Sequence, residues 1–164
     1  MIYCAGYTVS FQEVPDEVSL VLLISDCQHH CPGCHSPELQ KKTGKVLSEE
    51  YIDKLLSEYK SGVSCVCFMG EGDNLPELCR YARYIHSAYN LRTCLYTGTD
   101  EVTCFSKWFD DINGSLDYLK CGEYIADLGG LDSPTTNQKM YKLERFDGEF
   151  RMMNITSRFL KNYN

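Results

Sequence analysis

The feature that most constrains this chain is a group of three cysteines directly after an apolar run. Residues 20–24 read Leu-Val-Leu-Leu-Ile, and Cys27, Cys31 and Cys34 follow, separated by three and then two residues. A short apolar run of this kind is typical of a buried strand, so the cysteines lie in the loop that leaves it. In α/β folds ligands bind at that end of a strand. The sequence therefore predicts a ligand site after the first buried strand.

The spacing of the three cysteines favours an iron–sulfur cluster. Three thiolates can each bind one iron of a four-iron cube, which leaves the fourth iron open to a small molecule. Zinc ribbons and fingers normally use paired Cys-x-x-Cys knuckles, and the other seven of the ten cysteines supply no second one. The open alternative is a structural zinc site with His30 or His35 as the fourth ligand.

Composition narrows the class of protein. A chain of 164 residues with 43% hydrophobic content can bury a core without disulfides, so we expect one domain over residues 1–164. A net charge of −7 with 16 basic residues argues against nucleic-acid binding. The first residues lack the pattern of a signal peptide, and no apolar stretch reaches the roughly 20 residues of a membrane span. We therefore expect a cytoplasmic protein with reduced thiols, in which cysteines such as Cys65 and Cys94 pack in the core.

Apolar periodicity predicts strands that alternate with helices. The strands are expected at 18–25, 63–69, 91–96 and 116–121, and the helices at 49–59, 76–89 and 101–109. Ser48 and Asn90 have the character of a helix N-cap and a helix end. Near the C-terminus, 140–145 and 149–153 flank Asp147-Gly148, a dipeptide favoured in hairpin turns. The predicted fold is an α/β, open, shortened partial (β/α) barrel with mainly parallel strands and a C-terminal β-hairpin.

Several motifs together resemble the radical S-adenosylmethionine (SAM) superfamily. They are the cysteine triad, the turn Phe68-Met69-Gly70-Glu71 after the second strand, and Tyr96-Thr97-Gly98 after the third. Within the superfamily, the chain is similar to the activating proteins of anaerobic ribonucleoside-triphosphate reductase. This narrower match rests on His-Cys-Pro-Gly-Cys-His-Ser-Pro-Glu at 30–38, Tyr-Leu-Lys-Cys-Gly-Glu-Tyr at 118–124, and Leu-Asp-Ser-Pro-Thr-Thr-Asn-Gln-Lys-Met-Tyr at 131–141.

The resemblance implies a cofactor, a substrate and partners. Cys27, Cys31 and Cys34 would ligate a [4Fe-4S] cluster, and the amino nitrogen and carboxylate of SAM would chelate the open iron. Reductive cleavage of SAM would then generate a glycyl radical on the large subunit of the anaerobic ribonucleoside-triphosphate reductase. The electron would come from a reductant such as flavodoxin. The single domain would be a radical SAM domain, with neither nucleic acid nor membrane as a partner.

The same resemblance assigns further cofactor-binding residues, namely Gly33, His35, Gly70, Glu71, Thr97 and Gly98. Glu71 would meet the amino group of SAM, Thr97 and Gly98 would line its ribose, and Gly33 would let backbone approach the cluster. Each also has a simpler interpretation, since Gly33 is a turn glycine after Pro32 and the strand-end loops are polar in any case. Catalytic residues beyond the cluster ligands are not assigned.

Other polar residues have plain interpretations. His35 is expected either to hydrogen-bond near the cluster or to be solvated, and His29 and His30 to be solvated. Asn137 and Gln138 would face the reductase or the ribose, or satisfy backbone groups, as polar loop side chains commonly do.

The chain departs from relatives of this kind at several places. Asparagine is commoner where Ser36 stands, and the family's Gly-Gly-Glu turn is either Met69-Gly70-Glu71 or, shifted by one residue, Gly70-Glu71-Gly72. Relatives usually carry a Gly-Pro-Gly stretch before the first strand, where residues 14–17 read Val-Pro-Asp-Glu here, and a glycine where Asp26 stands. Residues 1–17 match no motif. Two other functions stay open: an activase of another glycyl-radical enzyme, such as pyruvate formate-lyase, or a radical SAM enzyme with a small-molecule substrate. A third, in a different class, is a non-enzymatic zinc or iron–sulfur protein.

Overall fold

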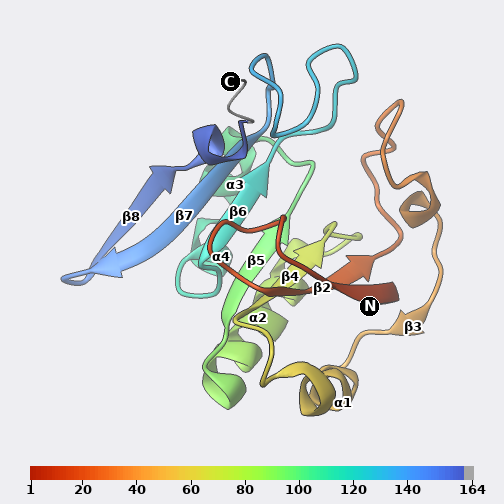
Figure 1. Cartoon of the computed structure of the whole chain (residues 1–164), viewed down its shortest axis with the longest axis vertical. Helices are drawn as coiled ribbons and strands as arrows, with labels where there is room; N and C mark the ends of the chain where they lie inside the picture. Colours follow the sequence, from red (N-terminus) through yellow and green to blue (C-terminus); the bar gives the residue numbers. More distant parts are fainter. Residues whose placement is uncertain (161–164) are drawn as a thin grey trace.

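Within residues 1–160, which the computed structural model describes, eight strands form one open sheet (Figure 1). The strands are β1 (Tyr3–Ser10), β2 (Ser19–Ile24), β3 (Lys45–Val46), β4 (Cys65–Met69), β5 (Arg92–Tyr96), β6 (Tyr118–Cys121), β7 (Lys139–Phe146) and β8 (Glu149–Asn154). The helices are α1 (Glu49–Tyr59), α2 (Leu75–Tyr89), α3 (Glu101–Lys107), α4 (Phe109–Ile112) and the 3-10 helices η1 (Pro37–Gln40) and η2 (Thr156–Phe159). The order across the sheet is β3-β1-β2-β4-β5-β6-β7-β8.

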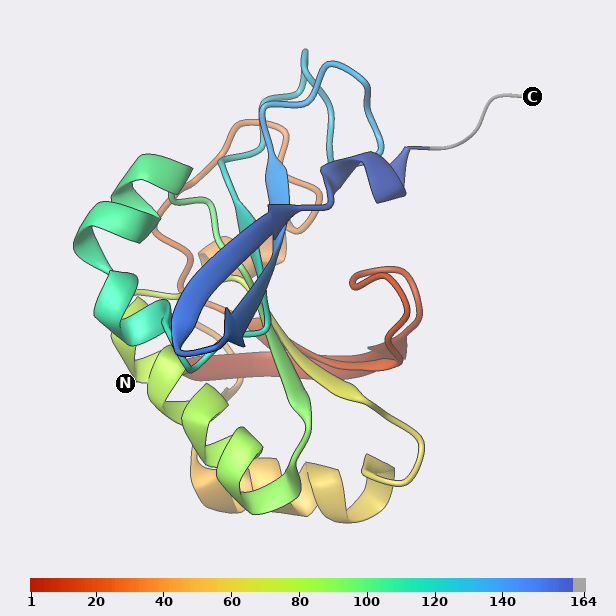
Figure 2. The ribbon, with the colours of Figure 1, turned by 90° about the vertical axis from the view of Figure 1, so that its left-hand side faces the viewer.

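The middle of the sheet is parallel because helices connect its strands. β2, β4, β5 and β6 run in the same direction, and α1, α2 and then α3 with α4 lie in the connections between them. Parallel neighbours need such crossovers. The four α-helices, α1 to α4, cover one face of the curved sheet (Figure 2). The carboxyl ends of the four parallel strands consequently meet at one edge, where their loops converge.

The sheet as a whole is mixed, which corrects the prediction of mainly parallel strands. Within residues 1–160, three strand pairings are parallel and four are antiparallel. β1 returns to β2 through residues 11–18, a connection shorter than the roughly 12 residues that a crossover needs. No helix lies between β6 and β7, which pair antiparallel. β1 was not predicted because most of its side chains are exposed or half-buried, so it forms no apolar run.

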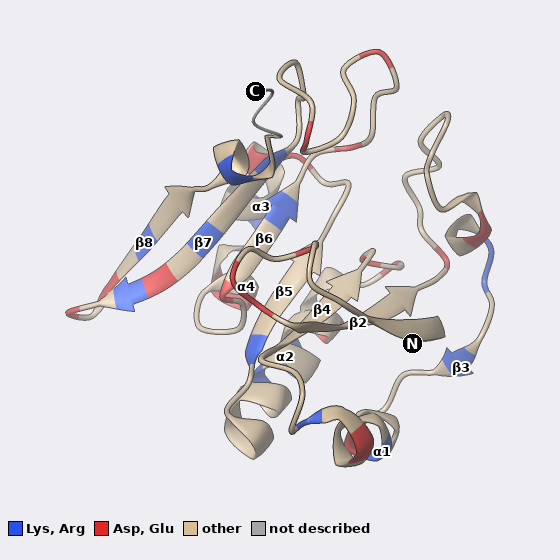
Figure 3. Cartoon of the chain, in the orientation of Figure 1, with Lys and Arg blue, Asp and Glu red and all other residues tan. Residues whose placement is uncertain are grey.

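β7 and β8 pair antiparallel around a two-residue turn. Phe146 lies opposite Glu149, and the intervening Asp147 and Gly148 have φ angles of 54° and 80°. Positive φ at both central residues is what a type I′ turn requires. Both strands carry charges of both signs (Figure 3), namely Lys139, Lys142, Glu144 and Arg145 on β7 and Glu149 and Arg151 on β8.

The helices match their predicted places, with one exception. α1 has the predicted bounds, and its N-cap Ser48 accepts a hydrogen bond from the backbone N–H of Tyr51 at 3.1 Å. α2 ends at Asn90, whose φ of 54° is the left-handed conformation of a helix C-cap. The helix predicted at 101–109 is instead two helices that meet at Trp108. None of the helices in residues 1–160 combines the length and apolar character of a membrane span.

The sheet has a core on each face. The larger core lies between the helices and the sheet and includes Phe68 and Leu95, both fully buried. The smaller core lies on the concave face, where the loop between β1 and β2 contributes Val14 and the segment before η2 contributes Ile155. Figure 2 shows this loop and η2 on the side of the sheet opposite the helices.

The cysteines outside the triad belong to these cores. Their exposed fractions are at most 2%, which confirms the prediction that they pack as small apolar side chains. The residues concerned are Cys4, Cys65, Cys67, Cys79, Cys94, Cys104 and Cys121.

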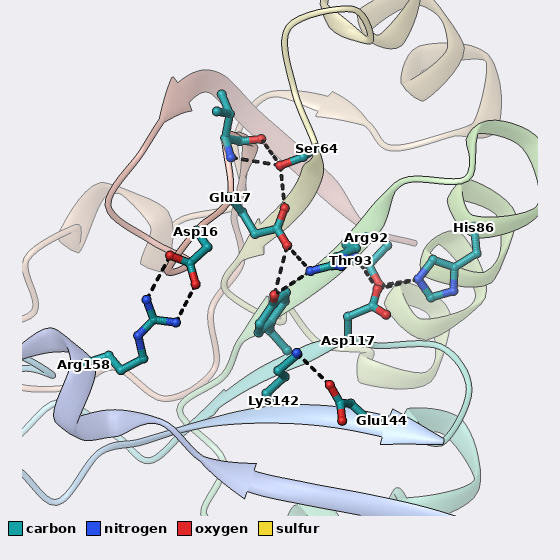
Figure 4. A network of polar contacts seen from close by, with 12 residues as sticks. Asp16, Glu17, Ser64, His86, Arg92, Thr93, Asp117, Lys142, Glu144 and Arg158 are labelled. Carbon is teal, nitrogen blue, oxygen red and sulfur yellow. Dashed lines mark hydrogen bonds and ion pairs between the residues drawn. The ribbon is translucent and has the colours of Figure 1, made fainter. Parts of the chain in front are cut away.

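A buried carboxylate joins the amino ends of the four parallel strands (Figure 4). Glu17, just before β2, accepts hydrogen bonds from Arg92 Nη1 at 2.6 Å and from the Tyr118 hydroxyl at 2.9 Å. Its other oxygen accepts from Ser64 Oγ at 2.5 Å. These partners begin β5 and β6 and precede β4. One side chain therefore fixes the relative positions of all four strands.

The contacts of residues 14–17 give this segment, which reads Val-Pro-Asp-Glu where the resemblance leads us to expect a Gly-Pro-Gly stretch, a structural role. Val14 enters the concave core, Glu17 ties the strands together, and Asp16 pairs with both Nη atoms of Arg158 at 2.6 and 2.9 Å. The segment that stands in place of Gly-Pro-Gly thus stabilises the fold, and it joins the chain before β2 to η2.

We predict that Glu17→Ala lowers the free energy of unfolding by about 2–3 kcal/mol, because it leaves the buried hydroxyl of Tyr118 without its acceptor and removes the hydrogen bonds from Ser64 and Arg92. Urea unfolding followed by circular dichroism measures this change. Glu58→Ala, at an exposed position of α1, is the matched control and should change stability little. Equal stabilities of the two variants would contradict the structural role of Glu17.

Candidate metal centre

The cysteine loop leaves β2 and folds back on the segment around η1. The Cys27 N–H donates to the carbonyl of Leu39 at 3.0 Å, and the Cys34 N–H donates to the carbonyl of Cys31 at 3.2 Å. Asp26 enters the loop with a φ of 65°, in the left-handed region that aspartate tolerates better than most residues. Glycine adopts this conformation freely, which accounts for its use in relatives. The departure at Asp26 therefore preserves the turn.

A cavity of about 990 Å³ lies between this loop and the ends of β4, β5 and β6. The thiols of the triad are half-buried, whereas the other seven are buried. Predicted site residues that line the cavity are Cys27, Cys31, Cys34, His35, Gly70, Thr97 and Gly98. Gly33 and Glu71 lie outside this lining. The fold thus gathers most of the predicted site around one space.

The donor set fits a cluster. Within residues 1–160, no three His, Cys, Asp or Glu side chains are arranged so that they could hold a metal ion. A single ion needs ligands that converge on one point, whereas a four-iron cube takes each thiolate on a different iron. Burial raises the pKa of the Cys27 thiol, so metal binding there would release a proton.

Glu71 lies at the end of β4, and side chains from two other loops hold its carboxylate. His29 Nε2 lies 2.6 Å from Oε1, and Thr99 Oγ1 donates to the same oxygen at 3.0 Å. The Thr97 hydroxyl donates to Oε2. Burial acts to raise the pKa of this carboxyl, but the hydrogen bonds from His29 and the two threonines outweigh it and lower the pKa. Glu71 is therefore an ionised carboxylate.

The prediction that His29 is solvated is wrong. Its hydrogen bond to Glu71 raises the pKa of the imidazole, against the opposing effect of burial. The ring also lies on the backbone of Gly98, where an added Cβ would be 2.6 Å from the ring atoms Cγ and Cδ2. Gly98 is thus needed for the close approach of a histidine. The local sequence carries no signal for this contact, because it joins two loops far apart in the chain.

Lys120 is a second residue of the site that the sequence motifs did not indicate. It is the penultimate residue of β6, is 8% exposed and lines the cavity, and its Nζ donates to the carbonyl of Gly122 at 2.6 Å. Burial lowers its pKa to about 8, although neighbouring thiols and Glu71 favour its charged form. A lysine inside a buried strand is rare without a partner or a function, and that signal was present in the sequence.

The loop after β6 supports the cysteine loop through Tyr124. His35 Nε2 lies 3.1 Å from the Tyr124 hydroxyl, and the two ring centroids are 4.5 Å apart. Gly33 has a φ of 73°, and a Cβ there would meet Ala126 and Tyr124 at 3.7 and 3.9 Å. Gly33 therefore serves as a turn glycine against this loop, which spans residues 122–130.

The Thr-Thr-Asn-Gln segment fastens the same loop. Each of its four side chains donates a hydrogen bond to a backbone carbonyl of residues 122–129. The pairs are Thr135 with Leu128, Thr136 with Gly129, Asn137 with Glu123 and Gln138 with Gly122, at 3.0, 3.3, 3.0 and 3.4 Å. The interpretation that Asn137 and Gln138 satisfy backbone groups is confirmed.

The comparison with protein families agrees with the donor set. Residues 17–140, which are 124 of the 164 residues, match a family model described as a 4Fe-4S single cluster domain. The match contains the triad, the strand ends and most of the loop after β6. No curated protein and no solved structure matches the chain.

We predict that Lys120→Met changes the pH dependence of stability. Because burial lowers the pKa of Lys120 from 10.5 to about 8, the unfolded chain binds more protons than the folded chain between these values. The free energy of unfolding of the wild type should therefore rise relative to that of the variant as the pH increases through this range. Urea unfolding across the range measures the difference, with exposed Lys54→Met as the control. A constant difference between wild type and Lys120→Met would contradict the desolvation of Lys120.

Proposed function

The chain belongs to the family of 4Fe-4S single cluster domains, and on that premise we propose that it is a radical SAM activating enzyme. Cys27, Cys31 and Cys34 would hold one [4Fe-4S] cluster, and the enzyme would cleave SAM reductively. Its product would be a glycyl radical on the large subunit of an anaerobic ribonucleoside-triphosphate reductase. The observation that carries the proposal is the placement of three half-exposed thiols on a cavity that the loops of three neighbouring strands complete.

Two opposite charges near the cavity support SAM as the ligand. The carboxylate of Glu71 lies at the end of β4 and the ammonium of Lys120 at the end of β6. The methionine part of SAM carries one ammonium and one carboxylate, so each could meet a group of opposite charge. Because Glu71 and Lys120 are largely buried, these contacts would be shielded from water and stronger than at the surface.

When bound, the cluster would supply one electron to the sulfonium of SAM, which gives methionine and a 5′-deoxyadenosyl radical that takes a hydrogen atom from the partner's glycine. The residues of this chain position the reactants. Gly70 has a φ of 100°, and a Cβ there would lie 2.9 Å from the carbonyl oxygen of Ile24, so only glycine fits between the ends of β4 and β2. Met69, Tyr96 and Leu131 give the cavity apolar walls that would exclude water.

The open sheet supports a protein as the final substrate. The strands do not close into a barrel, and loops rather than a further βα unit border the cavity. A partner's loop could then reach the site and complete its enclosure. Glycine is the residue that lets a backbone approach most closely, because it lacks a side chain. The electron would come from a reductant such as flavodoxin.

We predict that anaerobically reconstituted wild-type protein with dithionite converts SAM to methionine and 5′-deoxyadenosine, measured by chromatography. Cys31→Ala should lower the rate by more than about a hundredfold, because the cluster loses a ligand. Cys79→Ala is the matched control, since this thiol is buried in α2 and does not line the cavity. Addition of the reductase subunit should yield a glycyl-radical resonance in electron paramagnetic resonance.

The outcomes separate the competing functions. Bound zinc without SAM cleavage would reject the enzyme in favour of a metal protein. Cleavage that persists in Cys31→Ala would reject the ligand assignment. Cleavage with a radical on a different glycyl-radical enzyme, or on no protein, would keep the chemistry and replace the partner.

A further inference from the structure

His29 presents to Glu71 the kind of group that a ligand's ammonium would present. Its Nε2 lies 2.6 Å from Oε1 of the carboxylate. Within residues 1–160, the other side chains that hydrogen-bond this carboxylate are the hydroxyls of Thr97 and Thr99, which stay neutral. The imidazole is therefore the nitrogen donor among the side chains that contact Glu71.

Three side chains surround the carboxylate of Glu71. Oε1 accepts from Thr99 at 3.0 Å and contacts His29, and Oε2 accepts from Thr97. Thr99 Oγ1 also lies 3.3 Å from Oε2, but its single proton serves both oxygens, so three donors share the roughly four acceptor positions of the carboxylate. An ammonium that binds Oε1 competes with His29 for that oxygen.

The threonines are held in place more firmly than the histidine. The backbone N–H of Thr97 donates to the carbonyl of Lys120 at 2.9 Å, and the N–H of Thr99 donates to Thr97 Oγ1 at 2.8 Å. These bonds fix both residues to the sheet end. The side chain of His29, in contrast, comes from the cysteine loop and is 23% exposed.

The His29 ring has space into which it can move. A second cavity of about 630 Å³ lies beside the first, and within residues 1–160 His29 and Gly98 are the residues that line both. Gly98 offers no Cβ that would block the ring. A rotation of the side chain would thus bring it into open space and free Oε1 of Glu71.

From this geometry we propose that His29 occupies the ammonium subsite on Glu71, and that the amino group of SAM displaces it on binding. The inference rests on the proposed function, because it assumes SAM as the ligand. His29 thus competes with the amino group of SAM for Glu71, and it gives the carboxylate a hydrogen-bond partner while SAM is not bound. The competition lowers the affinity for SAM, since binding must first break the contact between His29 and Glu71.

The test is the affinity of His29→Ala for SAM. Equilibrium dialysis of anaerobically reconstituted protein without reductant measures binding in the absence of cleavage. We expect His29→Ala to bind SAM roughly tenfold more tightly than the wild type, because no hydrogen bond to Glu71 has to be broken first. 5′-Methylthioadenosine, which has no amino-acid part, should bind both proteins equally. His30→Ala, at the neighbouring exposed histidine, is the matched control and should bind SAM as the wild type does.

His29→Gln is a second variant, which keeps the test valid if His29→Ala does not fold. Its side chain keeps an N–H donor for Glu71, so its affinity for SAM should lie between those of the wild type and His29→Ala. Unchanged or weaker SAM binding in the folded variants would overturn the inference, as would equal tightening for 5′-methylthioadenosine. A wild type that neither binds nor cleaves SAM would instead refute the proposed function, so the two failures are distinguishable.

Discussion

One largely buried carboxylate, that of Glu71, joins the loops that form the site. It lies at the end of β4 and contacts His29 from the cysteine loop after β2 and Thr97 and Thr99 from the loop after β5. The parallel register makes this possible, because it brings the carboxyl ends of these strands to one edge. The site is therefore assembled from side chains of three loops that the sheet aligns.

The amino ends of the parallel strands stabilise the fold, whereas their carboxyl ends form the candidate site. At the amino ends, Glu17 has hydrogen bonds to residues that begin or precede the other parallel strands, and these contacts stabilise the fold. At the carboxyl ends, Glu71 and Lys120 lie among loops that contain glycines with positive φ angles and the half-buried thiols of the triad. Charged groups are buried at both ends, but only the carboxyl ends border the larger cavity together with the cysteine triad. This division separates substitutions that affect stability from those that affect binding.

Much of the fold follows from the sequence because local signals determine it. Apolar runs place the parallel strands, Ser48 and Asn90 fix helix ends, and the cysteine spacing locates the candidate metal centre. β1 could not be predicted from local signals, because its side chains are mostly exposed and its backbone becomes a strand only by pairing with β2 and β3. The contact of His29 with Glu71 could not be predicted either, because it requires a glycine, Gly98, on another loop. Interactions between distant loops are set by the assembled sheet.

The proposed cluster takes three thiolate ligands from the protein and leaves one of its four irons for a small molecule. Mössbauer spectroscopy of anaerobically assembled protein, prepared with isotopically enriched iron, distinguishes the irons. One iron should have a signal that differs from those of the other three and changes when SAM is added. Four equivalent irons whose signals SAM leaves unchanged would contradict it.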